Sequence, residues 1–455
     1  MKQYTFKGIL QNEGWLENRA VTIDRDGIIV DIEQVNMNEV DAGYALPGFQ
    51  NAHSHAFQYA MAGLAEKHDA NATNGDFWSW REAMYRLALN ISPDQLEDIA
   101  TMLYAEMVRH GYTSVAEFHY VHHDKNGKQY DNLAEMGSRL VAAAETAGIN
   151  ITLVPIFYQK GGFGVAPNER QKRFISPSVD DYMKLLDASQ AICKHYNGAN
   201  IAIGIHSMRG VEPEHISEIA QFGPQNLPFH IHISEQLKEI EDAVEYLGKR
   251  PVEWLAENVA LSDRFHLVHA THITDNETAS IAQSGANVVL CPTTEGNLGD
   301  GIFPLRKYQE LGGKWSIGTD SHVGLNPLEE LRLLDYGQRL VSHKRDTFNS
   351  AEQGDSGLFA FEMASTAGRK AMNNFEEKFF EVGKPLNAII YDDKSPLIGS
   401  TSIDNMASTI LYSSDASMQE TTIINGKEVV TAGQHINNEA ISNNFFKTIK
   451  ELENR

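Results

Sequence analysis

Two histidines separated by one residue follow a predicted buried strand near the start of the chain. The motif His53-Ser54-His55 comes shortly after the apolar run 45–49, and residues i and i+2 of a strand share a face, so both imidazoles can bind one cation. A single histidine at a strand end is more often structural. Three later predicted strands, however, also end in histidine or aspartate, at His232, His269 and Asp320. Parallel barrels draw catalytic groups from the C-terminal ends of several strands, so the pattern predicts a metal site.

Length and composition limit the possible classes of protein. A chain of 455 residues with 42% hydrophobic residues suits one large barrel and a smaller module. The two cysteines, Cys193 and Cys291, lie far apart and in no zinc-ligand spacing, which indicates a reducing compartment without disulfides. The N-terminus has no apolar signal core, and no run of about 18 apolar residues occurs. The formal net charge of -23 repels nucleic acid and anionic membranes, so we expect a cytoplasmic protein that binds neither.

Predicted strands alternate with predicted helices over most of the chain. The first strand ends near His53, and seven further β-rich runs cover 113–120, 151–158, 201–206, 228–234, 265–269, 287–291 and 315–320. Helix-start signals lie between them, for example at 92–95 and 274–277. Because no GxGxxG or P-loop sequence occurs, this α/β pattern favours a (β/α)8 TIM-like barrel over a doubly wound sheet.

Both ends of the chain have a β-rich pattern outside the barrel. Residues 1–46 contain an Asp26-Gly27 turn between two β-rich runs, and residues after 385 contain an Asn425-Gly426 turn. We therefore expect a small discontinuous β-sandwich made of 1–46 and 385–455, the latter including a C-terminal tail, around a metal-dependent barrel at 47–384. An independent C-terminal domain is the alternative.

The expected metal ligands are His53, His55, His232 and Asp320. Neutral imidazoles and a carboxylate suit zinc, and Fe²⁺ or Mn²⁺ stay open. An open coordination position would lower the pKa of a bound water to about 7. No lysine follows the fourth strand, so a second metal bridged by a carbamylated lysine is not expected. We therefore expect one zinc ion per subunit.

Two residues near these ligands are candidates for proton transfer. Glu235 lies three residues after His232, where its carboxylate could carry protons between water and a leaving nitrogen. The alternative is a solvated glutamate at the start of a helix. His269 is expected to orient or deprotonate the water and to stabilise charge in the transition state. Five other histidines are not assigned to the site: His119, His122 and His123 are expected on the surface or in loops, and His230 and His266 are expected to point elsewhere.

The candidate substrate contacts are two arginines and three polar residues. An Arg fork binds a carboxylate through two hydrogen bonds, so Arg209, together with His206, is expected to hold one carboxylate. Arg81 could hold a second; its alternative is an exposed helix arginine with its stem over the neighbouring tryptophan. Tyr120 and Gln58 could donate hydrogen bonds, although packing explains each of them equally well. The predicted substrate is therefore a small dicarboxylate.

The pattern resembles the amidohydrolase superfamily, whose members join a metal-bearing barrel to a small β-sandwich built from both chain ends. More narrowly, the chain is similar over almost its full length to the formimidoylglutamate deiminase family. The similar stretches are 53–58 (HSHAFQ), 60–65 (AMAGLA), 77–85 (FWSWREAMY), 207–211 (SMRGV), 232–236 (HISEQ) and 291–301 (CPTTEGNLGDG).

The resemblance implies hydrolysis of N-formimino-L-glutamate to N-formyl-L-glutamate and ammonia in histidine degradation. It places Gln58, Arg81, Tyr120, His206 and Arg209 around the substrate, and it implies a homodimer. In the mechanism that we expect, His269 and Asp320 position the attacking nucleophile. Glu235 then passes a proton to the departing nitrogen.

Two other functions stay open. A related amidohydrolase that deaminates a purine or pyrimidine base would use the same metal and acid positions, although Arg81 and Arg209 argue against a neutral heterocycle. A non-catalytic scaffold on the same fold is the weaker alternative, because such a protein is expected to have lost its metal ligands, and here they are present.

Overall fold

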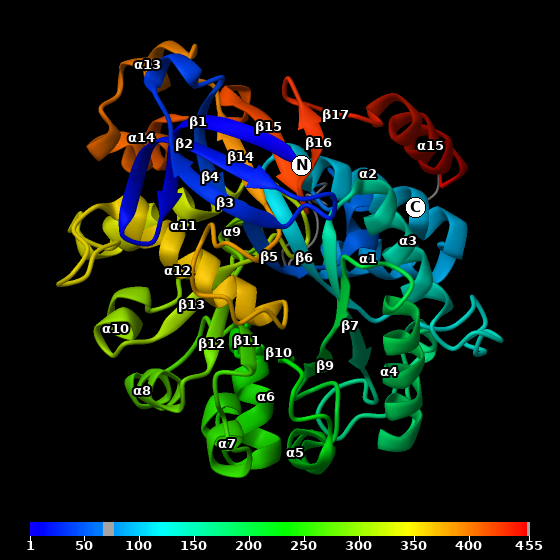
Figure 1. Ribbon diagram of the computed structural model, residues 1–455. Coiled ribbons are helices and arrows are strands. Elements are labelled where there is room, and N and C mark those ends of the chain that lie inside the picture. Colours follow the sequence, from blue (N-terminus) through cyan, green and yellow to red (C-terminus); the bar gives the residue numbers. More distant parts are fainter. Residues whose placement is uncertain (67–76, 453–455) are drawn as a thin grey trace.

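The computed structural model describes residues 1–66 and 77–452 and arranges them in two sheets (Figure 1). One sheet is a nearly closed barrel of parallel strands that is surrounded by helices. The other is built from the two ends of the chain and lies above the barrel in Figure 1. The predicted TIM-like barrel with a discontinuous β-sandwich is thus confirmed.

The barrel strands follow one another around the axis in chain order. They are β5 (Phe49–Ser54), β6 (Tyr112–His119), β7 (Asn150–Phe157), β9 (Ile203–Ser207), β10 (Phe229–Ile233), β11 (Phe265–His269), β12 (Asn287–Leu290) and β13 (Lys314–Ile317), with β8 (Ala199–Ile201) beside β7. The last and first strands meet only at their ends, where the Asp320 N–H donates to the His53 carbonyl over 3.0 Å and the His55 N–H donates to the Asp320 carbonyl over 3.2 Å. Closure of the barrel therefore places Asp320 against the His53-Ser54-His55 motif.

Helices connect the barrel strands and cover the outside of the barrel. They are α1 (Phe77–Asn90), α2 (Pro93–Arg109), α3 (Glu135–Ala147), α4 (Val179–Cys193), α5 (Pro213–Phe222), α6 (Leu237–Leu247), α7 (Pro251–Asn258), α8 (Asp275–Ser284), α9 (Pro292–Leu298), α10 (Leu305–Glu310), α11 (Pro327–Ser342) and α12 (Ser356–Ala371). Short 3-10 helices are η1 (Met37–Glu39), η2 (Ala56–Met61), η3 (Glu169–Gln171), η4 (Ile403–Asn405) and η5 (Ala416–Met418). The predicted helix starts at Ser92 and Thr274 both form, since each side-chain oxygen accepts the backbone N–H three residues later.

The second sheet joins strands from both chain ends in the order β17-β16-β15-β14-β4-β1-β2-β3. Its strands are β1 (Lys2–Gln11), β2 (Gly14–Ile23), β3 (Ile29–Gln34), β4 (Ala42–Pro47), β14 (Ala388–Tyr391), β15 (Gln419–Ile424), β16 (Lys427–Thr431) and β17 (Gln434–His435). Helices α13 (Pro396–Ser400) and α14 (Met406–Ser413) follow β14, and the last helix, α15 (Asn438–Glu451), packs on α2. The domain boundaries at 46 and 384 stay a prediction.

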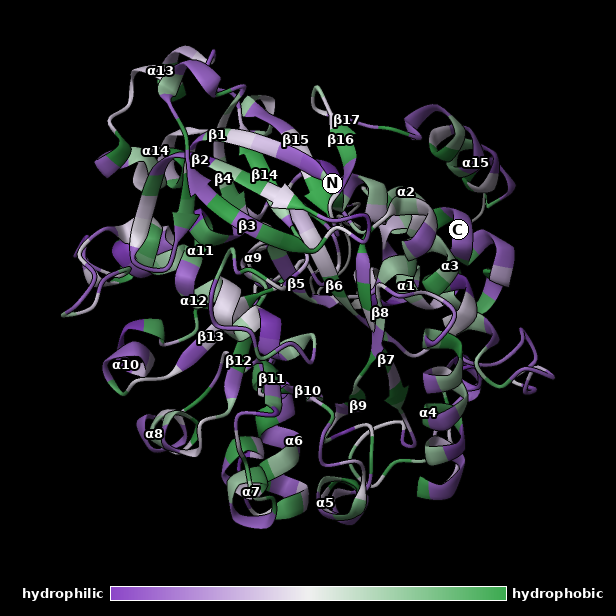
Figure 2. Cartoon of the chain, in the orientation of Figure 1, coloured by the Kyte–Doolittle hydropathy of each residue, from purple (hydrophilic) through white to green (hydrophobic). Residues whose placement is uncertain are grey.

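The barrel strands are buried, whereas the outer helices have both hydrophobic and hydrophilic residues. All residues of β5, β10, β11 and β12 are buried, as expected for strands of a parallel barrel that is covered by helices. The outer helices, such as α4 and α7, mix hydrophilic and hydrophobic residues along their length (Figure 2). Among the described residues, no helix is both long and apolar enough to cross a membrane.

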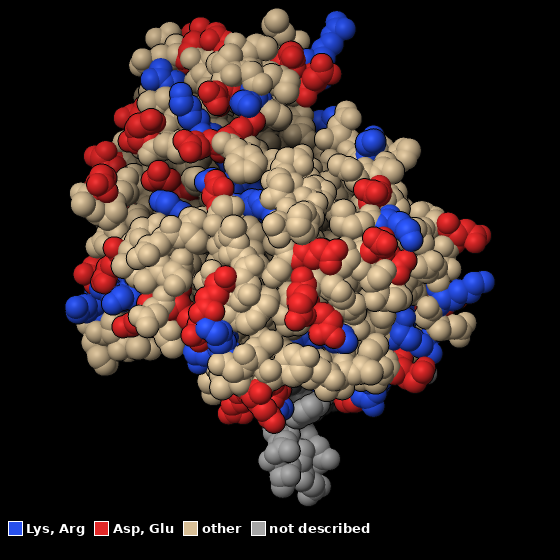
Figure 3. Space-filling view, turned by 90° about the horizontal axis from the view of Figure 1, so that it is seen from below, with Lys and Arg blue, Asp and Glu red and all other residues tan. Residues whose placement is uncertain are grey.

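Charged side chains are mixed on the surface. Figure 3 shows Asp and Glu spread over the face that is seen from below, with Lys and Arg between them. This distribution agrees with the strongly negative formal charge of the chain, -23. An acidic surface of this kind repels polyanions at long range.

Arg173 is a fully buried cation that fastens the C-terminal end of α1. Its guanidinium donates to the carbonyls of Ala88 over 2.5 Å and Ile91 over 2.9 Å, and its Nε donates to the His123 carbonyl over 2.8 Å. A cation suits this position because the last carbonyls of a helix lack partners within the helix. The same helix carries Arg81, so Arg173 also fixes one wall of the site described below.

We expect Arg173→Met to destabilise the protein by about 3 to 5 kcal/mol, because three buried carbonyls lose charged donors. Arg170→Met is the matched control: Arg170 is exposed and pairs with Glu82 on the same helix. Its loss should cost less than about 1 kcal/mol. Thermal unfolding midpoints of both variants provide the measurement, and equal midpoints would contradict this role of Arg173.

Candidate active site

The predicted site residues meet in one cavity of about 400 Å³ at the C-terminal ends of the barrel strands. Every one of them except His53 lines this cavity, and His53 is buried directly beside His55. The lining residues among them are His55, Gln58, Arg81, Tyr120, His206, Arg209, His232, Glu235, His269 and Asp320. The structure thus brings together all the residues that the sequence selected, although their individual roles stay predictions.

Three imidazole nitrogens converge at the bottom of the cavity. The Nε2 atom of His53 lies 3.1 Å from that of His55 and 3.0 Å from that of His232. The Asp320 carboxylate completes the group, with Oδ1 3.2 Å from His55 Nε2 and 3.5 Å from His53 Nε2. These groups come from three strand ends that are far apart in the sequence.

The chemistry of this group fits a divalent cation. The Nδ1 atoms of His55 and His232 lie 2.7 Å and 2.8 Å from backbone carbonyls, so they carry the proton and leave both Nε2 lone pairs free. Burial lowers the pKa of His53 to about 3, which keeps this ring neutral. Burial raises the pKa of Asp320, but the adjacent imidazoles of His53 and His55 outweigh it and hold the pKa well below its usual value. Neutral imidazoles and an ionised carboxylate are the donor set that zinc prefers.

Left-handed backbone conformations occur at the C-terminal ends of three barrel strands, β10, β11 and β13. Ser234 has φ = 54°, His269 has φ = 70° and Asp320 has φ = 46°, although none is glycine. Such conformations cost energy and persist only where the surroundings fix them. The strand ends of β10, β11 and β13 are therefore held in the shape that directs their polar side chains into the cavity.

His269 stands between three carboxylates. Its Nδ1 lies 3.2 Å from Glu295 Oε1, while its Nε2 lies 3.8 Å from Glu235 Oε1 and 3.7 Å from Asp320 Oδ2. Burial lowers the pKa of His269, but these carboxylates outweigh it and raise the pKa to about 10. A divalent cation bound to Asp320 would oppose this rise, because it neutralises one of the carboxylates. His269 Nε2 thus faces the carboxylates of Glu235 and Asp320, with both at ion-pair rather than hydrogen-bond distance.

The wall of the cavity carries the two predicted arginines. Arg209 follows β9; burial lowers its pKa, but the carboxylates of Glu239 and Glu235 outweigh burial and raise the pKa above its usual value. Among the described residues, no carboxylate oxygen lies within 4.0 Å of the Arg209 guanidinium. Arg81 lies on α1, donates to the Tyr85 hydroxyl over 3.3 Å and stands over the Tyr85 ring. Two cationic groups thus face one cavity.

Polar groups with fixed orientations complete the wall. Gln58 donates from Nε2 to the Tyr120 hydroxyl over 3.1 Å. The His206 ring stacks on Tyr158 with 4.2 Å between ring centroids, and its Nδ1 lies 2.9 Å from the Ser207 hydroxyl. Packing holds each of these side chains in one orientation, as a binding site requires.

Comparisons with known proteins agree with this architecture. A sequence profile of the amidohydrolase family matches residues 44–429, which is most of the chain. The chain belongs to the amidohydrolase family. A formimidoylglutamate deiminase of Pseudomonas aeruginosa is 41% identical over 444 residues, which cover 97% of each chain. An amidohydrolase from Brucella melitensis has a similar structure, with a TM-score of 0.93, 37% identity and coverage of 99% of this chain and 100% of that one.

A more distant relative is named for a different substrate. The 5-methylthioadenosine/S-adenosylhomocysteine deaminase of Halobacterium salinarum is 26% identical over 435 residues, covering 92% of this chain and 90% of that protein. The amidohydrolase family is metal-dependent, and the cluster of His53, His55 and His232, whose ligand atoms lie close enough to hold one ion, fits that property.

Several residues of this amidohydrolase site were missed in the sequence. Glu117, in the middle of β6, accepts hydrogen bonds from the Ser54 hydroxyl and the Ala56 N–H, both over 2.6 Å, and burial raises its pKa to about 7. Glu295 Oε1 lies 3.2 Å from His269 Nδ1, and Glu239 lines the cavity. One signal was available: Glu117 is a carboxylate within the otherwise apolar run Val115–Phe118.

The prediction that His119, His122 and His123 lie on the surface or in loops holds in part. His122 and His123 lie in the loop after β6, whereas His119 is the last residue of that strand, and all three are buried. His122 and His123 each place Nε2 within hydrogen-bond distance of a backbone carbonyl, beneath the segment that contains Arg173. By contrast, His230 points away from the site as predicted, toward the Ala371 carbonyl of α12.

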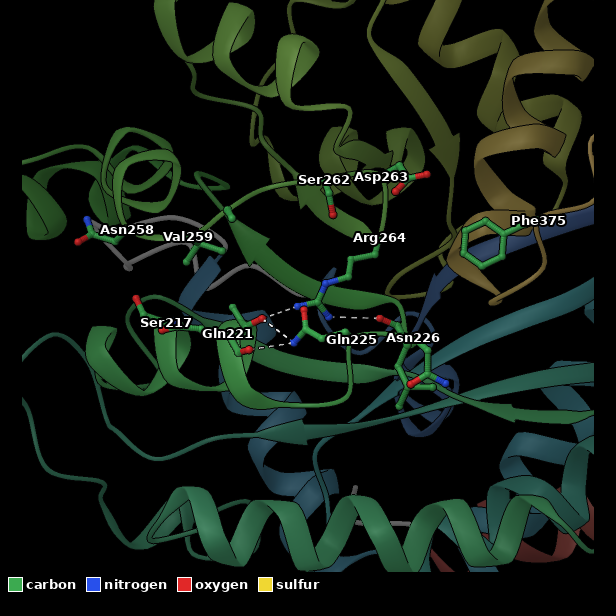
Figure 4. Close-up of a pocket in the computed structure, with 13 residues that line it drawn as sticks. Ser217, Gln221, Gln225, Asn226, Asn258, Val259, Ser262, Asp263, Arg264 and Phe375 are labelled. Carbon is green, nitrogen blue, oxygen red and sulfur yellow. Dashed lines mark hydrogen bonds between the residues drawn. The ribbon is translucent and has the colours of Figure 1, made fainter.

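A second large cavity lies before strands β10 and β11, at the opposite end of the amidohydrolase barrel (Figure 4). Arg264 lines this cavity, and its guanidinium donates to the Ala220 carbonyl over 2.6 Å. The Gln225 amide likewise donates to the carbonyls of Ala220 over 3.1 Å and Gln221 over 3.2 Å. Backbone carbonyls thus already bind the Arg264 guanidinium and the Gln225 amide of this cavity.

Proposed function

We propose that the protein hydrolyses N-formimino-L-glutamate to N-formyl-L-glutamate and ammonia in histidine degradation. One observation carries this proposal: Arg81 and Arg209 face the same cavity as the metal-binding group. A substrate with two carboxylates needs two cationic partners beside the reacting centre. The name of the Pseudomonas aeruginosa relative, formimidoylglutamate deiminase, supports the same substrate.

The proposed cofactor is one zinc ion per subunit, held by His53, His55, His232 and Asp320, with Fe²⁺ or Mn²⁺ as alternatives. When bound, such an ion would act as a Lewis acid and make water nucleophilic near neutral pH. The carbonyls that hold His55 and His232 through Nδ1 keep the ligand nitrogens in position.

The proton transfers are assigned to residues of this chain. His269 and Asp320 orient the attacking water, and Glu235 accepts a proton from it. The water oxygen forms a bond with the formimino carbon, and Glu235 then delivers the proton to the terminal nitrogen. Starting from a protonated formimino group, cleavage of the bond between this carbon and the terminal nitrogen releases ammonia. The hydroxyl oxygen forms the C=O bond as its proton passes to Glu235, which leaves the formyl group on glutamate. Arg209 with His206 binds one carboxylate, Arg81 binds the other, and Gln58 and Tyr120 contact the substrate.

We expect Arg209→Met to raise KM for N-formimino-L-glutamate by about 10- to 100-fold, with kcat changed much less, because a charged hydrogen bond is lost in both the ground and the transition state. Arg81→Met should act in the same direction. Initial rates over a range of substrate concentrations measure both effects, with the exposed Arg170→Met as control. An unchanged KM in both site variants would remove the basis for a dicarboxylate substrate.

A second candidate function is deamination of a purine or pyrimidine, and the nucleoside deaminase name of the Halobacterium salinarum relative favours it. For a neutral heterocycle, however, the two arginine variants should change KM little. A non-catalytic scaffold is the weakest alternative, since a cavity with a complete donor set is present.

We further propose that the protein is a cytoplasmic homodimer that binds neither nucleic acid nor membranes. The formal net charge of -23 supports the last two points. The proposed units remain 1–46 with 385–455, and 47–384.

A further inference from the structure

Glu239 is a buried carboxylate whose two oxygens are both used by the backbone next to Glu235. It lies on the first turn of α6, is only 3% exposed and lines the active-site cavity. Its Oε1 accepts the Ser234 N–H over 3.1 Å, and its Oε2 accepts the Glu235 N–H over 3.0 Å. A single side chain thus holds two consecutive amides of the segment that carries Glu235.

The backbone of this segment has an unfavourable conformation that these hydrogen bonds stabilise. Ser234 adopts φ = 54°, a conformation that serine rarely takes. The carbonyls of this segment accept hydrogen bonds from residues that follow β11: Ala270 N–H donates to the Ile233 carbonyl over 3.0 Å, and His272 N–H donates to the Ser234 carbonyl over 2.9 Å. The N–H groups of the segment donate to Glu239. Loss of this carboxylate would therefore release the turn from one side and free the direction of the Glu235 side chain.

Glu239 also lines the same cavity as Arg209. The charge of the Glu239 carboxylate raises the pKa of Arg209. The same two side chains both line the cavity in which a substrate carboxylate would bind Arg209. A negative charge at Glu239 therefore weakens the attraction of Arg209 for an incoming carboxylate, while it balances a partly buried cation before substrate binds.

We propose that Glu239 is a positioning residue that acts through two neighbours: it holds Glu235 in the orientation for proton transfer, and it moderates the affinity of Arg209 for the substrate carboxylate. This inference rests on the proposed function. It predicts a combination of effects that simple loosening of the site would not produce, because the two neighbours affect different kinetic constants.

The test is Glu239→Gln, which keeps the size of the side chain and one acceptor oxygen but removes the charge and one hydrogen bond. We expect kcat to fall by about 10- to 100-fold, since misplacement of a catalytic group by a small distance has effects of this size. KM should stay equal or fall, because Arg209 gains attraction for the substrate. Zinc content should stay unchanged, and amide hydrogen exchange of the peptide spanning 233–236 should become faster.

The matched control is Glu277→Gln. Glu277 is also a buried glutamate on the first turn of a helix, 4% exposed, and accepts the Thr274 N–H, but it lies outside the cavity. It should leave kcat, KM and exchange at 233–236 unchanged. If Glu239→Gln does not fold, as judged by circular dichroism, Glu239→Asp replaces it. That variant keeps the charge, so kcat should fall with KM unchanged.

Two results would overturn the inference: unchanged exchange at 233–236, or a rise of KM with unchanged kcat. Failure of the proposed function would look different. A wild-type protein that does not hydrolyse N-formimino-L-glutamate would refute the substrate, whereas the exchange measurement would still decide whether Glu239 holds the Glu235 turn.

Discussion

Glu235→Gln lowers kcat for N-formimino-L-glutamate by about 100- to 10,000-fold while zinc content stays at about one ion per chain. The amide keeps the shape of the side chain but cannot accept and deliver a proton. Glu235 lines the cavity and places Oε1 3.8 Å from His269 Nε2, outside the group of converging ligand nitrogens. Steady-state rates, together with metal analysis of the same samples, measure both quantities.

Glu241→Gln is the control for this prediction, because Glu241 lies on the same helix α6 as an exposed residue. It should keep kcat within about twofold. A Glu235→Gln variant with normal turnover would show that Glu235 is only a glutamate at the start of a helix. In that case its replacement would affect stability rather than kcat.

His232→Asn should lose both zinc and activity. The variant removes one of three converging Nε2 atoms. Mutation of a residue that only hydrogen-bonds to a metal ligand typically lowers metal affinity or activity by about 10- to 100-fold, so loss of a ligand itself should have a larger effect. We therefore expect kcat to fall by more than about 100-fold and zinc after dialysis to fall well below one ion per chain. Treatment of the wild-type protein with a chelator should have the same effect on turnover, and added zinc should restore it.

His230→Asn is the matched control on the same strand. His230 lies two residues before His232 and its Nε2 lies 3.1 Å from the Ala371 carbonyl, away from the cavity. This variant should retain zinc. Equal zinc loss in both variants would mean that the effect comes from damage to β10 rather than from removal of a ligand.

Much of the barrel and the metal group could be predicted because both depend on local periodicity. Strand alternation places His53 and His55 on one face. It does not separate His230 from His232, which are also two residues apart; the pairing register of β10 shifts between Ile231 and His232, and their rings contact different partners. The right order of eight strands follows from β-rich runs separated by helix-start signals such as 274–277, which form as expected. Asp320 could be placed beside His53 because the last strand of a barrel must meet the first.

Residues that act through tertiary contacts could not be predicted. Glu295 lies on α9, which follows β12, and contacts His269 at the end of β11. Glu239 lies on α6 and accepts the backbone N–H of Glu235, which precedes that helix. Both look like ordinary helix-start glutamates in the sequence. The burial of His122 was missed for a similar reason, because its cover comes from the segment around Arg173, about 50 residues later. Sequence spacing carries no information on such contacts.

Release of ammonia by the zinc-loaded protein tests the central claim most directly. N-formimino-L-glutamate, guanine and cytosine would be supplied in parallel, each with a chelated control. We predict chelator-sensitive release from N-formimino-L-glutamate alone. Release from a base but not from N-formimino-L-glutamate would contradict the proposed substrate and the carboxylate-binding role of Arg81 and Arg209, while leaving the barrel unchanged.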